Sequence, residues 1–463
     1  MDKQISPRDT RVARGLLRAL FTLTATLAVA TAYAQRAPQR IIVMYQPVTN
    51  ELATNAARSM TAMTARYGVS MRAVRRMHNG AIVMTMDREM TDRDYNQLVS
   101  EISASSNVVY AEADRMFRRT FTPNDTYYNL QWHYYETAGG LNVPTAWDLS
   151  TGQGVTVAVI DTGYRPHVDL AASIVGGYDF ISDTFVSRDG NLRDADARDP
   201  GDWNAAGECG AGIGASDSSW HGTHVAGTVA ARTNNARGVA GVAFNARVLP
   251  VRVLGRCGGY TSDIADGLVW ASGGTVAGVP NNLNPARVAN LSLGGGGACG
   301  TTMQNAINSA RSRGTVVVVA AGNENRNAAN SSPANCSGVV VVAAVNRSGG
   351  RAYYSNFGSV VDVAAPGGAM NVSTGNGVLS TLNTGTTTPG SDAYAYYQGT
   401  SMATPHVAAV AALMLSVNSS LTPAQIETTL RNTTRAFPAT CSQCGTGIVN
   451  ARSAVVAAQS AAR

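Results

Sequence analysis

Three side chains that together suit nucleophilic catalysis stand at the ends of apolar segments. Asp161 closes the run GVTVAVID, His221 opens HGTHVAGTVAA, and Ser401 precedes the apolar part of QGTSMATPHVAAVAALML. A carboxylate can orient an imidazole, the imidazole can take the proton of a hydroxyl, and the hydroxyl oxygen can then attack a carbonyl carbon. Taken singly, these residues are as well explained as a turn cap, a structural histidine and a helix cap. Their combination is what predicts an acyl-transfer site.

The segments that must hold these residues indicate an α/β fold with a mostly parallel sheet and helices on both faces. Five runs are apolar throughout instead of alternating, which is typical of strands buried on both faces. They cover residues 154–161, 246–254, 286–293, 314–322 and 338–345. Residues 222–232, 261–272 and 300–314 have the pattern of helices between them. Alternation of strands and helices favours a parallel sheet, whose sites form beyond the carboxyl ends of its strands.

The first 119 residues divide into two segments. Residues 1–34 carry five basic groups, a short apolar core and small residues at Ala32 and Ala34, as a secretory signal peptide does. The alternative is a membrane anchor, but the short core and the Ala-x-Ala ending favour removal before Gln35. Residues 35–119 predict a small α+β domain, with strands over 40–45, 81–86 and 107–115 and helices over 49–68 and 91–105. Residues 117–125 predict an exposed linker and a processing site.

Charge and composition exclude several function classes for the mature protein. The net charge of +6 comes from residues 1–34, with +3, and 35–119, with +4, so residues 120–463 carry about −1. A nucleic-acid partner therefore loses its electrostatic support, and Arg72, Arg75 and Arg76 are interpreted as a solvated face. No apolar run downstream of the signal approaches the length of a membrane helix, so the mature form is expected without a membrane anchor. A hydrophobic fraction of 44% suits a packed globular core.

All six cysteines follow residue 120, and an even number in an exported chain predicts disulfides. Cys441 and Cys444 form a C-x-x-C pair, which could be a redox pair, half of a metal site or a local disulfide. Because no second such pair exists, the local disulfide is the favoured interpretation. For the other four cysteines the sequence spacing leaves the pairing open.

The motifs around the three reactive residues resemble the signatures of the subtilisin-like serine proteases. They are VIDTG at Asp161, HGTHVAG at His221 and GTSMATPHVA at Ser401, in that family's order, and the resemblance extends from about residue 124 to 455. It implies that Asp161 orients His221, that His221 is the general base and that Ser401 is the nucleophile. In AAGNEN it assigns Asn323 to the oxyanion hole, beside the backbone N–H of Ser401. His224 and His406 are expected to be structural.

The resemblance also implies how protein and peptide substrates bind. In this family a peptide adds as a strand to exposed backbone edges, and pockets read its side chains. Ser292, Leu293, Gly294 and Gly295 would wall the main specificity pocket, whose floor is expected within residues 330–333. Gly258 and Gly259 would form the second edge. A broad specificity that tolerates apolar side chains is expected.

Calcium is the cofactor that the resemblance implies. Asp169 and Asn235 would bind it through side-chain oxygens, and Arg237 and Val239 through backbone oxygens, in a loop at residues 234–239. A second cation site is a hypothesis from charge density alone, because four carboxylates crowd nine positions. They belong to Asp194, Asp196, Asp199 and Asp202. The alternative is a solvated acidic loop.

Three further expectations rest on the same resemblance. The disulfides would pair Cys209 with Cys257, Cys299 with Cys336, and Cys441 with Cys444. Residues 35–119 would be an intramolecular chaperone and inhibitor that the catalytic domain, residues 120–463, cuts off near residue 119; an unrelated α+β domain is the alternative. The mature protein would be a secreted, monomeric serine endopeptidase.

Two other functions remain to be weighed against this one. An inactive, peptide-binding relative is disfavoured by the complete set of reactive residues. A secreted esterase or lipase would need a Gly-x-Ser-x-Gly elbow, which the sequence from Gly399 to Ala403 does not supply.

Overall fold

The computed structural model describes residues 39–46, 61–116 and 121–461. The chain separates into two compact units, residues 1–118 and 119–463, and each is described here by itself. Three predictions fall outside the described residues: the signal segment, most of the helix over 49–68, and the processing site near 119. Of that helix, residues 61–68 are described, and residues 61–66 are helical.

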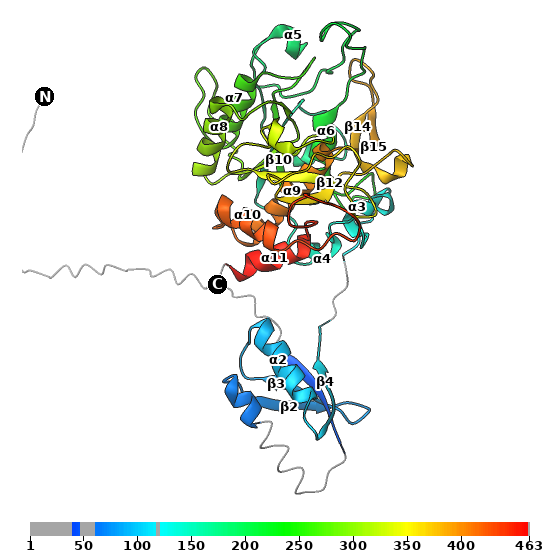
Figure 1. Cartoon of the computed structure of the whole chain (residues 1–463), viewed down its shortest axis with the longest axis vertical. Coiled ribbons are helices and arrows are strands. Elements are labelled where there is room, and N and C mark those ends of the chain that lie inside the picture. The colour runs from blue at the N-terminus through cyan, green and yellow to red at the C-terminus, as the bar shows by residue number, and fades with distance from the viewer. Residues whose placement is uncertain (1–38, 47–60, 117–120, 462–463) are drawn as a thin grey trace, which may run out of the picture. The chain divides into compact units, whose positions relative to one another are not determined.

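The smaller unit is an antiparallel sheet of four strands with a helix packed on it (Figure 1). In the order β2-β3-β1-β4, the strands are β2 Met71–Arg76, β3 Ile82–Met86, β1 Arg40–Tyr45 and β4 Val108–Ala113. Helix α2, Asp92–Ser103, begins after Thr91, whose side chain accepts from the backbone N–H of Asp94. Strand β2 was not predicted, because its arginines interrupt any apolar alternation. They are solvated, as expected, since β2 is an exposed edge strand.

The larger unit is built on a sheet of seven strands in which every pair is parallel. Its order is β13-β12-β10-β8-β5-β7-β6. The strands are β5 Thr156–Asp161, β6 Tyr178–Asp179, β7 Arg247–Arg252, β8 Val288–Leu291, β10 Val316–Ala320, β12 Val340–Val345 and β13 Val363–Pro366. The strands β6 and β7, which follow β5 in the chain, lie on one side of it, and β8 and the later strands lie on the other, so the strand order reverses at β5. Ligand sites of open α/β sheets form beside the carboxyl end of such a strand.

Helices cover both faces of this sheet, as the sequence predicted. One face packs on α6 His221–Ala230, α9 Thr400–Val417 and α11 Ala451–Ser460, and the other on α7 Thr261–Ala271 and α8 Thr301–Ser312. In Figure 1, α7 and α8 lie side by side and α9 runs through the centre. The hairpin of β14 Val378–Asn383 and β15 Asp392–Tyr397 packs on α6. Shorter elements complete the unit: η1 Tyr128–Leu130, α3 Trp132–Tyr135, α4 Pro144–Trp147, η2 Ala171–Ser173, α5 Thr184–Ser187, β9 Gly295–Gly296, η3 Ala328–Asn330, β11 Ser331–Ser332, η4 Thr374–Asn376 and α10 Pro423–Asn432.

Helix α9 corrects one sequence expectation. By length and composition it could cross a membrane, whereas no apolar run after the signal was expected to be long enough. The structure explains the run differently, because 83% of this stretch is buried inside the protein. Its side chains from Met402 to Leu415 fill the core between the sheet and α6. A helix that is apolar on every side is typical of such a central position.

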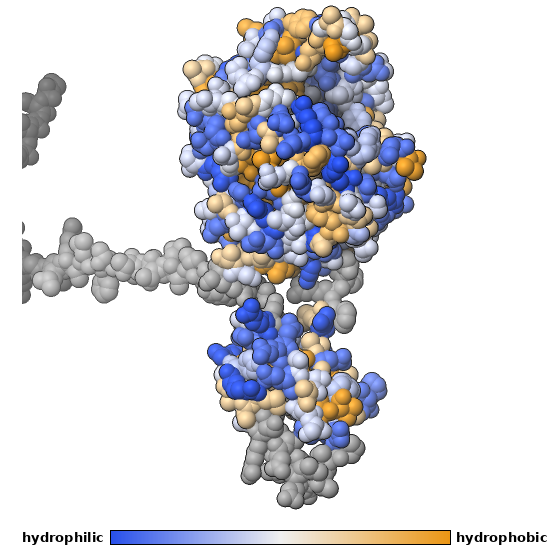
Figure 2. All heavy atoms as spheres, in the orientation of Figure 1, coloured by the Kyte–Doolittle hydropathy of each residue, from blue (hydrophilic) through white to orange (hydrophobic). Residues whose placement is uncertain are grey.

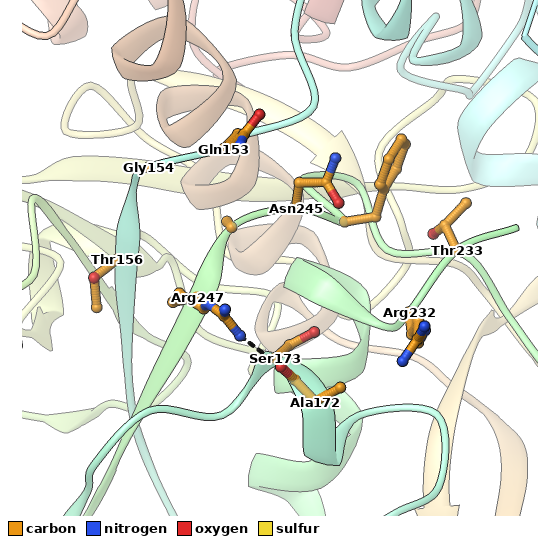
Figure 3. Close-up of a pocket in the computed structure, with 11 residues that line it drawn as sticks. Gln153, Gly154, Thr156, Ala172, Ser173, Arg232, Thr233, Asn245 and Arg247 are labelled. Carbon is orange, nitrogen blue, oxygen red and sulfur yellow. Dashed lines mark hydrogen bonds between the residues drawn. The ribbon is translucent and has the colours of Figure 1, made fainter. Parts of the chain in front are cut away.

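The six cysteines form the three disulfides that the resemblance implied. They join Cys209 to Cys257, Cys299 to Cys336, and Cys441 to Cys444. On the visible face of the larger unit, hydrophilic and hydrophobic residues are interspersed (Figure 2). The larger unit also has a hollow of about 680 Å³ at the amino ends of β5 and β7, at the edge of the sheet opposite to Asp161. Figure 3 shows Thr156, Arg232 and Arg247 at this hollow, with Arg247 bonded to the Ala172 carbonyl.

Candidate active site

Asp161 and His221 meet where β5 ends and α6 begins. Asp161 is fully buried, and His221 Nδ1 lies 2.8 and 2.9 Å from its two carboxylate oxygens. Since an ionised carboxylate only accepts, Nδ1 carries the hydrogen, and Nε2 of the neutral ring is the free acceptor. Burial acts to lower the pKa of His221, but the charge and hydrogen bond of Asp161 outweigh it and raise the pKa above its ordinary value. The pair therefore favours a protonated imidazole more than free histidine does.

The first turn of α6 is fixed to the end of β5. Thr162 Oγ1 accepts from the Gly222 N–H at 3.0 Å, and a Cβ at Gly222 would collide with the Gly163 carbonyl. Trp220, just before the helix, has φ 48°, a left-handed conformation that is costly for a bulky residue. Its indole N–H donates to the Gly385 carbonyl, and the side chain is buried. The close contact between the backbones of Gly222 and Gly163, together with the left-handed backbone of Trp220, fixes the start of α6 and so holds the imidazole of His221 in place.

Ser401 lies in the first turn of α9, but it does not cap the helix. Gly399 is the N-cap, with φ 154°, and it has no side chain that could accept from the first turn. The hydroxyl of Ser401 instead donates to the Ser292 carbonyl at 3.1 Å, and the Ser292 hydroxyl donates to the Ser401 carbonyl at 2.8 Å. The Ser401 carbonyl is free because its helical donor would be the N–H of residue 405, and that residue is Pro405, which has no N–H. The proline thus lets the helix bond directly to the pocket wall.

No hydrogen bond between Ser401 Oγ and His221 is formed among the described residues. Both residues border Ser292, His221 in a hollow of about 330 Å³ and Ser401 in one of about 190 Å³. Long or missing catalytic bonds are common in the absence of substrate. Within the described parts of the chain, one hydrogen bond, to the Ser292 carbonyl, holds Ser401 Oγ, so rotation about its side-chain bond can release it.

Asn323 has an orientation that leaves its amide nitrogen free. Its Oδ1 accepts from the Thr400 N–H at 2.8 Å and from the Thr400 hydroxyl at 2.9 Å. A backbone N–H can only donate, so the atom facing it must be the oxygen. The Nδ2 group is then a donor without an acceptor among the described residues, as is the backbone N–H of Ser401. Both residues line the hollow of about 190 Å³.

The predicted pocket residues gather around this hollow. Ser292, Leu293, Gly294 and Gly295 line one side, and Ser331 and Ser332, from the predicted floor, line another. A second hollow, of about 570 Å³, includes Gly258, Gly259 and Pro333 together with the apolar Ile264 and Met303. Sequence reasoning missed Ala320, Ala321, Gly322 and Glu324, which also line the smaller hollow. Their place beside Asn323 in AAGNEN was the available signal.

The two remaining histidines of this region are buried away from these hollows. His224 Nε2 contacts the carbonyls of Val378 and Ala395, and its ring stacks on Tyr397. Burial lowers the pKa of His224 to about 3 and that of His406 to about 4. His406 is bonded to His133 at 2.8 Å, so both predicted structural histidines make contacts within the core.

The sequence profile of the subtilase family, peptidase family S8, matches residues 152–447. The chain belongs to the subtilase family. It is similar to an extracellular protease of Xanthomonas campestris pv. campestris, with 55% identity over 91% of this chain and 73% of that protein. An extracellular basic protease of Dichelobacter nodosus is 42% identical over 90% of this chain and 70% of its own length. The chain is thus a secreted serine protease of this family.

A solved structure supports the same assignment of fold. The structure of proteases from Pseudoalteromonas arctica PAMC 21717 matches with a TM-score of 0.72 and 66% identity. The match covers 73% of the present subtilase and all of that chain. The parallel α/β fold with helices on both faces is therefore confirmed.

The oxygen-rich loop predicted to bind calcium lies beside two buried carboxylates. Asp169 accepts from the Asn235 amide at 2.7 Å and from the Val239 N–H at 2.9 Å. The second carboxylate, Asp125, was missed, and it accepts from the N–H groups of Asn234 and Asn235. Burial raises the pKa of both carboxyl groups, and no cationic side chain pairs with either among the described residues.

The backbone of this loop alternates in a way that suits a hard cation. The carbonyls of Ala236 and Gly238 accept from Thr126 and Tyr127, whereas those of Arg237 and Val239 receive no donor in the described chain. Two acidic side chains and two free carbonyls form the donor set that calcium prefers. Asn235 faces Asp169 with its nitrogen, so its oxygen would have to turn to become a ligand.

The second proposed cation site is not assembled in this subtilase. Each of the four carboxylates has a different partner. Asp194 accepts from the Asn191 amide and the Asp196 N–H, and Asp196 pairs with Arg198. Asp199 accepts from the Thr162 hydroxyl, and Asp202 accepts from the Ser219 hydroxyl. In the described parts of the chain, no three His, Cys, Asp or Glu residues converge as metal ligands would. Of the four, Asp196 is paired with an arginine, and the other three accept hydrogen bonds from neutral donors of separate segments.

Proposed function

We propose that this subtilase is an endopeptidase of broad specificity whose triad is Asp161, His221 and Ser401. The observation that carries the proposal is the donor-acceptor arrangement at the carboxyl end of β5. Asp161 holds His221 in the tautomer whose Nε2 can accept a proton, while the free N–H groups of Asn323 and Ser401 face one hollow. These are the roles that acyl transfer to serine requires.

In acylation, the Ser401 hydroxyl would give up its hydrogen bond to the Ser292 carbonyl. Its oxygen would then attack the peptide carbonyl carbon while its proton passes to His221 Nε2. The carbonyl oxygen becomes an anion, stabilised by Asn323 Nδ2 and the Ser401 N–H at the start of α9. His221 then gives its proton to the leaving nitrogen, the C–N bond breaks, and an acyl ester of Ser401 remains.

In deacylation, a water molecule would take the place of the departed amine beside His221. The imidazole takes a proton from the water as its oxygen attacks the ester, and the same two N–H groups stabilise the second tetrahedral intermediate. As this intermediate collapses, the bond between the acyl carbon and Ser401 Oγ breaks, His221 returns the proton to Oγ, and the carboxylic acid product leaves the free enzyme. Asp161 stays ionised and stabilises the imidazolium in both halves of the reaction.

Broad specificity is proposed from the pocket linings. The hollow at Ser401 is walled by small residues, including Gly294, Gly295 and Ala321, so its contacts are mostly to backbone. The larger hollow is bounded by Leu254, Ile264 and Met303, and it suits an apolar side chain farther from the cleaved bond. Backbone pairing along the glycine-rich edges would supply the remaining affinity.

Maturation and calcium binding are proposed alongside catalysis. Residues 1–34 would be a signal peptide, and residues 35–119 an inhibitory prodomain that the catalytic domain, residues 120–463, removes near residue 119. The mature enzyme would be a monomer. Asp169, Asn235 and the carbonyls of Arg237 and Val239, with Asp125 as an added ligand, would hold a calcium ion that fixes the loop without entering the chemistry.

The proposal is tested with the full precursor and its Ser401→Ala variant. The wild type should lose its N-terminal segment near residue 119 and digest casein, while the variant should stay uncut and inactive. Ser416→Ala, on the same helix α9 but bonded to the Gln153 carbonyl, is the matched control and should behave as wild type. Processing of the Ser401→Ala precursor at the normal rate would contradict self-cleavage. Peptide binding without casein cleavage would favour an inactive relative, and cleavage of esters alone an esterase.

A further inference from the structure

Asp202 lines the cleft directly beside His221. Its Oδ1 accepts from the Ser219 N–H at 2.6 Å, and its Oδ2 accepts from the Ser219 hydroxyl at 2.7 Å. These two bonds fix the carboxylate, and each of its oxygens keeps lone pairs for a further donor. The group is partly exposed and borders the hollow of about 330 Å³ that also contains His221 and Ser292.

The negative charge of Asp202 is not matched by the protein around it. Among the described residues, the carboxylate makes no ion pair, and no Lys or Arg lines the hollow. The arginines of the neighbouring loops are committed elsewhere, because Arg188 and Arg256 both pair with Glu208. They also stack on Trp203 and Phe185. Apart from Asp202, His221 is the titratable side chain that lines the hollow, and its Nδ1 is already bonded to Asp161.

The position of this hollow identifies the substrate residue that would enter it. The residue whose carbonyl is attacked places its side chain in the hollow at Ser401 and Asn323. In an extended peptide, successive side chains point to opposite sides. The preceding residue therefore turns toward the other hollow that borders Ser292, the one at His221. That hollow shares Leu254, Cys257 and Gly258 with the larger apolar one, so both lie along a single peptide-binding edge.

We propose that Asp202 is a specificity-determining residue that gives this cleft a preference for a cationic side chain, Arg or Lys, at the second residue on the acyl side of the cleaved bond. This inference rests on the proposed function, and it adds a charge preference to a specificity that is otherwise broad. A long cationic side chain would lie along Leu254 and Gly258 and donate to the free lone pairs of the carboxylate. Asp202 also contributes to the raised pKa of His221, after burial and Asp161, so the preference is measured as a ratio between two peptides on the same enzyme, in which that effect cancels.

The test compares two peptides that differ only in charge at this position. One carries Arg and the other citrulline, which has the same shape without the charge, and all other residues are identical. For the mature wild type at low ionic strength, kcat/KM should be roughly tenfold higher for the Arg peptide, the size of one charge-assisted hydrogen bond. Raising the salt concentration should reduce this ratio, because the pair is partly exposed.

The decisive variant is Asp202→Asn, which keeps an acceptor for Ser219 while removing the charge. The Arg-to-citrulline ratio should fall to about one. Asp217→Asn is the matched control, since Asp217 is an exposed acid of the same segment that does not line the hollow, and it should keep the wild-type ratio. Hydrolysis of the citrulline peptide by the wild type, absent in Ser401→Ala, reports separately on the proposed function.

Two results would overturn the assignment. One is a wild-type ratio within twofold of unity while the citrulline peptide is cleaved. The other is an Asp202→Asn enzyme that keeps the preference for Arg. Either result would restrict Asp202 to holding Ser219 in place, and both leave the proposed endopeptidase activity intact.

Discussion

At the residue scale, the protonation of His221 decides the pH dependence of activity. The charge and hydrogen bond of Asp161 more than offset burial and raise the pKa of His221 above its ordinary value of 6.5. A general base must be neutral, so kcat/KM should rise with pH through a midpoint above 6.5.

Asp161→Asn should lower kcat about 10⁴-fold, since an amide no longer enforces the productive tautomer. Both effects can be read from pH–rate profiles of a chromogenic peptide, and a wild-type midpoint below 6 would contradict the first.

The free amide of Asn323 leads to a second prediction at this scale. Asn323→Ala should lower kcat by about 10²–10³-fold and leave KM nearly unchanged, because an oxyanion donor acts mainly in the transition state. The substitution also removes the acceptor for the N–H and hydroxyl of Thr400. Circular dichroism and the melting temperature must therefore show that the variant is folded. A higher KM at constant kcat would mean that Asn323 binds the ground state instead.

Sequence reasoning named Asp161, His221, Ser401 and Asn323 because each sits inside a motif read within one short segment. It missed Asp125, which lies far along the chain from Asp169 and joins it only through the loop that both contact. For the same reason the four acids around Asp196 were read as one cluster. Their partners, such as Thr162 and Ser219, come from other segments.

At the element scale, the strands of the parallel sheet were the most predictable part of the fold. Runs such as residues 338–345 bury both faces, so their composition alone identifies them. The hairpin of β14 and β15 was not predicted, although β15 alternates Ala and Tyr as DAYAYY. The residues of β15 are mostly half-buried, and those of β14 are mostly buried. The apolar run of β14 is interrupted by Ser380 and Thr381, whose hydroxyls donate to backbone carbonyls of α6. Hydrophobic pattern thus identifies strands whose buried side chains are apolar better than strands that bury polar side chains with partners elsewhere in the chain.

The start of α6 offers the sharpest test of how an element positions the site. A Cβ at Gly222 would meet the Gly163 carbonyl, which is backbone and cannot rotate away. Gly222→Ala should therefore shift the first turn of α6, with kcat/KM falling about 10²-fold from displacement of His221. Overpacking should also cost about 1–3 kcal/mol of stability. Gly214→Ala is the matched control, because its Cβ would meet open space, and it should change neither quantity. Wild-type kinetics for Gly222→Ala would refute this positioning argument.

At the scale of the whole molecule, the proposed calcium ion links the N-terminal end of the larger unit to its interior. Asp125 and Asp169 leave two buried negative charges unpaired within the described chain, so removing a bound cation should destabilise the fold. Ligand at about 100 times its Kd contributes about 2.7 kcal/mol, which corresponds to a melting temperature lower by roughly 5 °C after chelation. Differential scanning calorimetry with EDTA, and again after adding calcium, measures the shift. Asp169→Ala should abolish the response, whereas an unchanged response in that variant would exclude this loop.

The order of the strands leads to a last prediction, about how the mature enzyme folds. Neighbours in the sheet are often distant in sequence, as β5 and β8 are, and β10, β12 and β13 extend the sheet only after most of the chain has been synthesised. Such non-local pairing makes folding slow, so a segment that stabilises a partly folded state would accelerate it. Denatured residues 120–463 carrying Ser401→Ala, which prevents self-digestion, should refold slowly alone. Adding residues 35–119 as a separate chain should raise the rate, measured by tryptophan fluorescence. An unrelated small α+β protein at equal concentration is the control. If refolding is equally fast with residues 35–119, with the control protein and with buffer alone, the chaperone role is rejected.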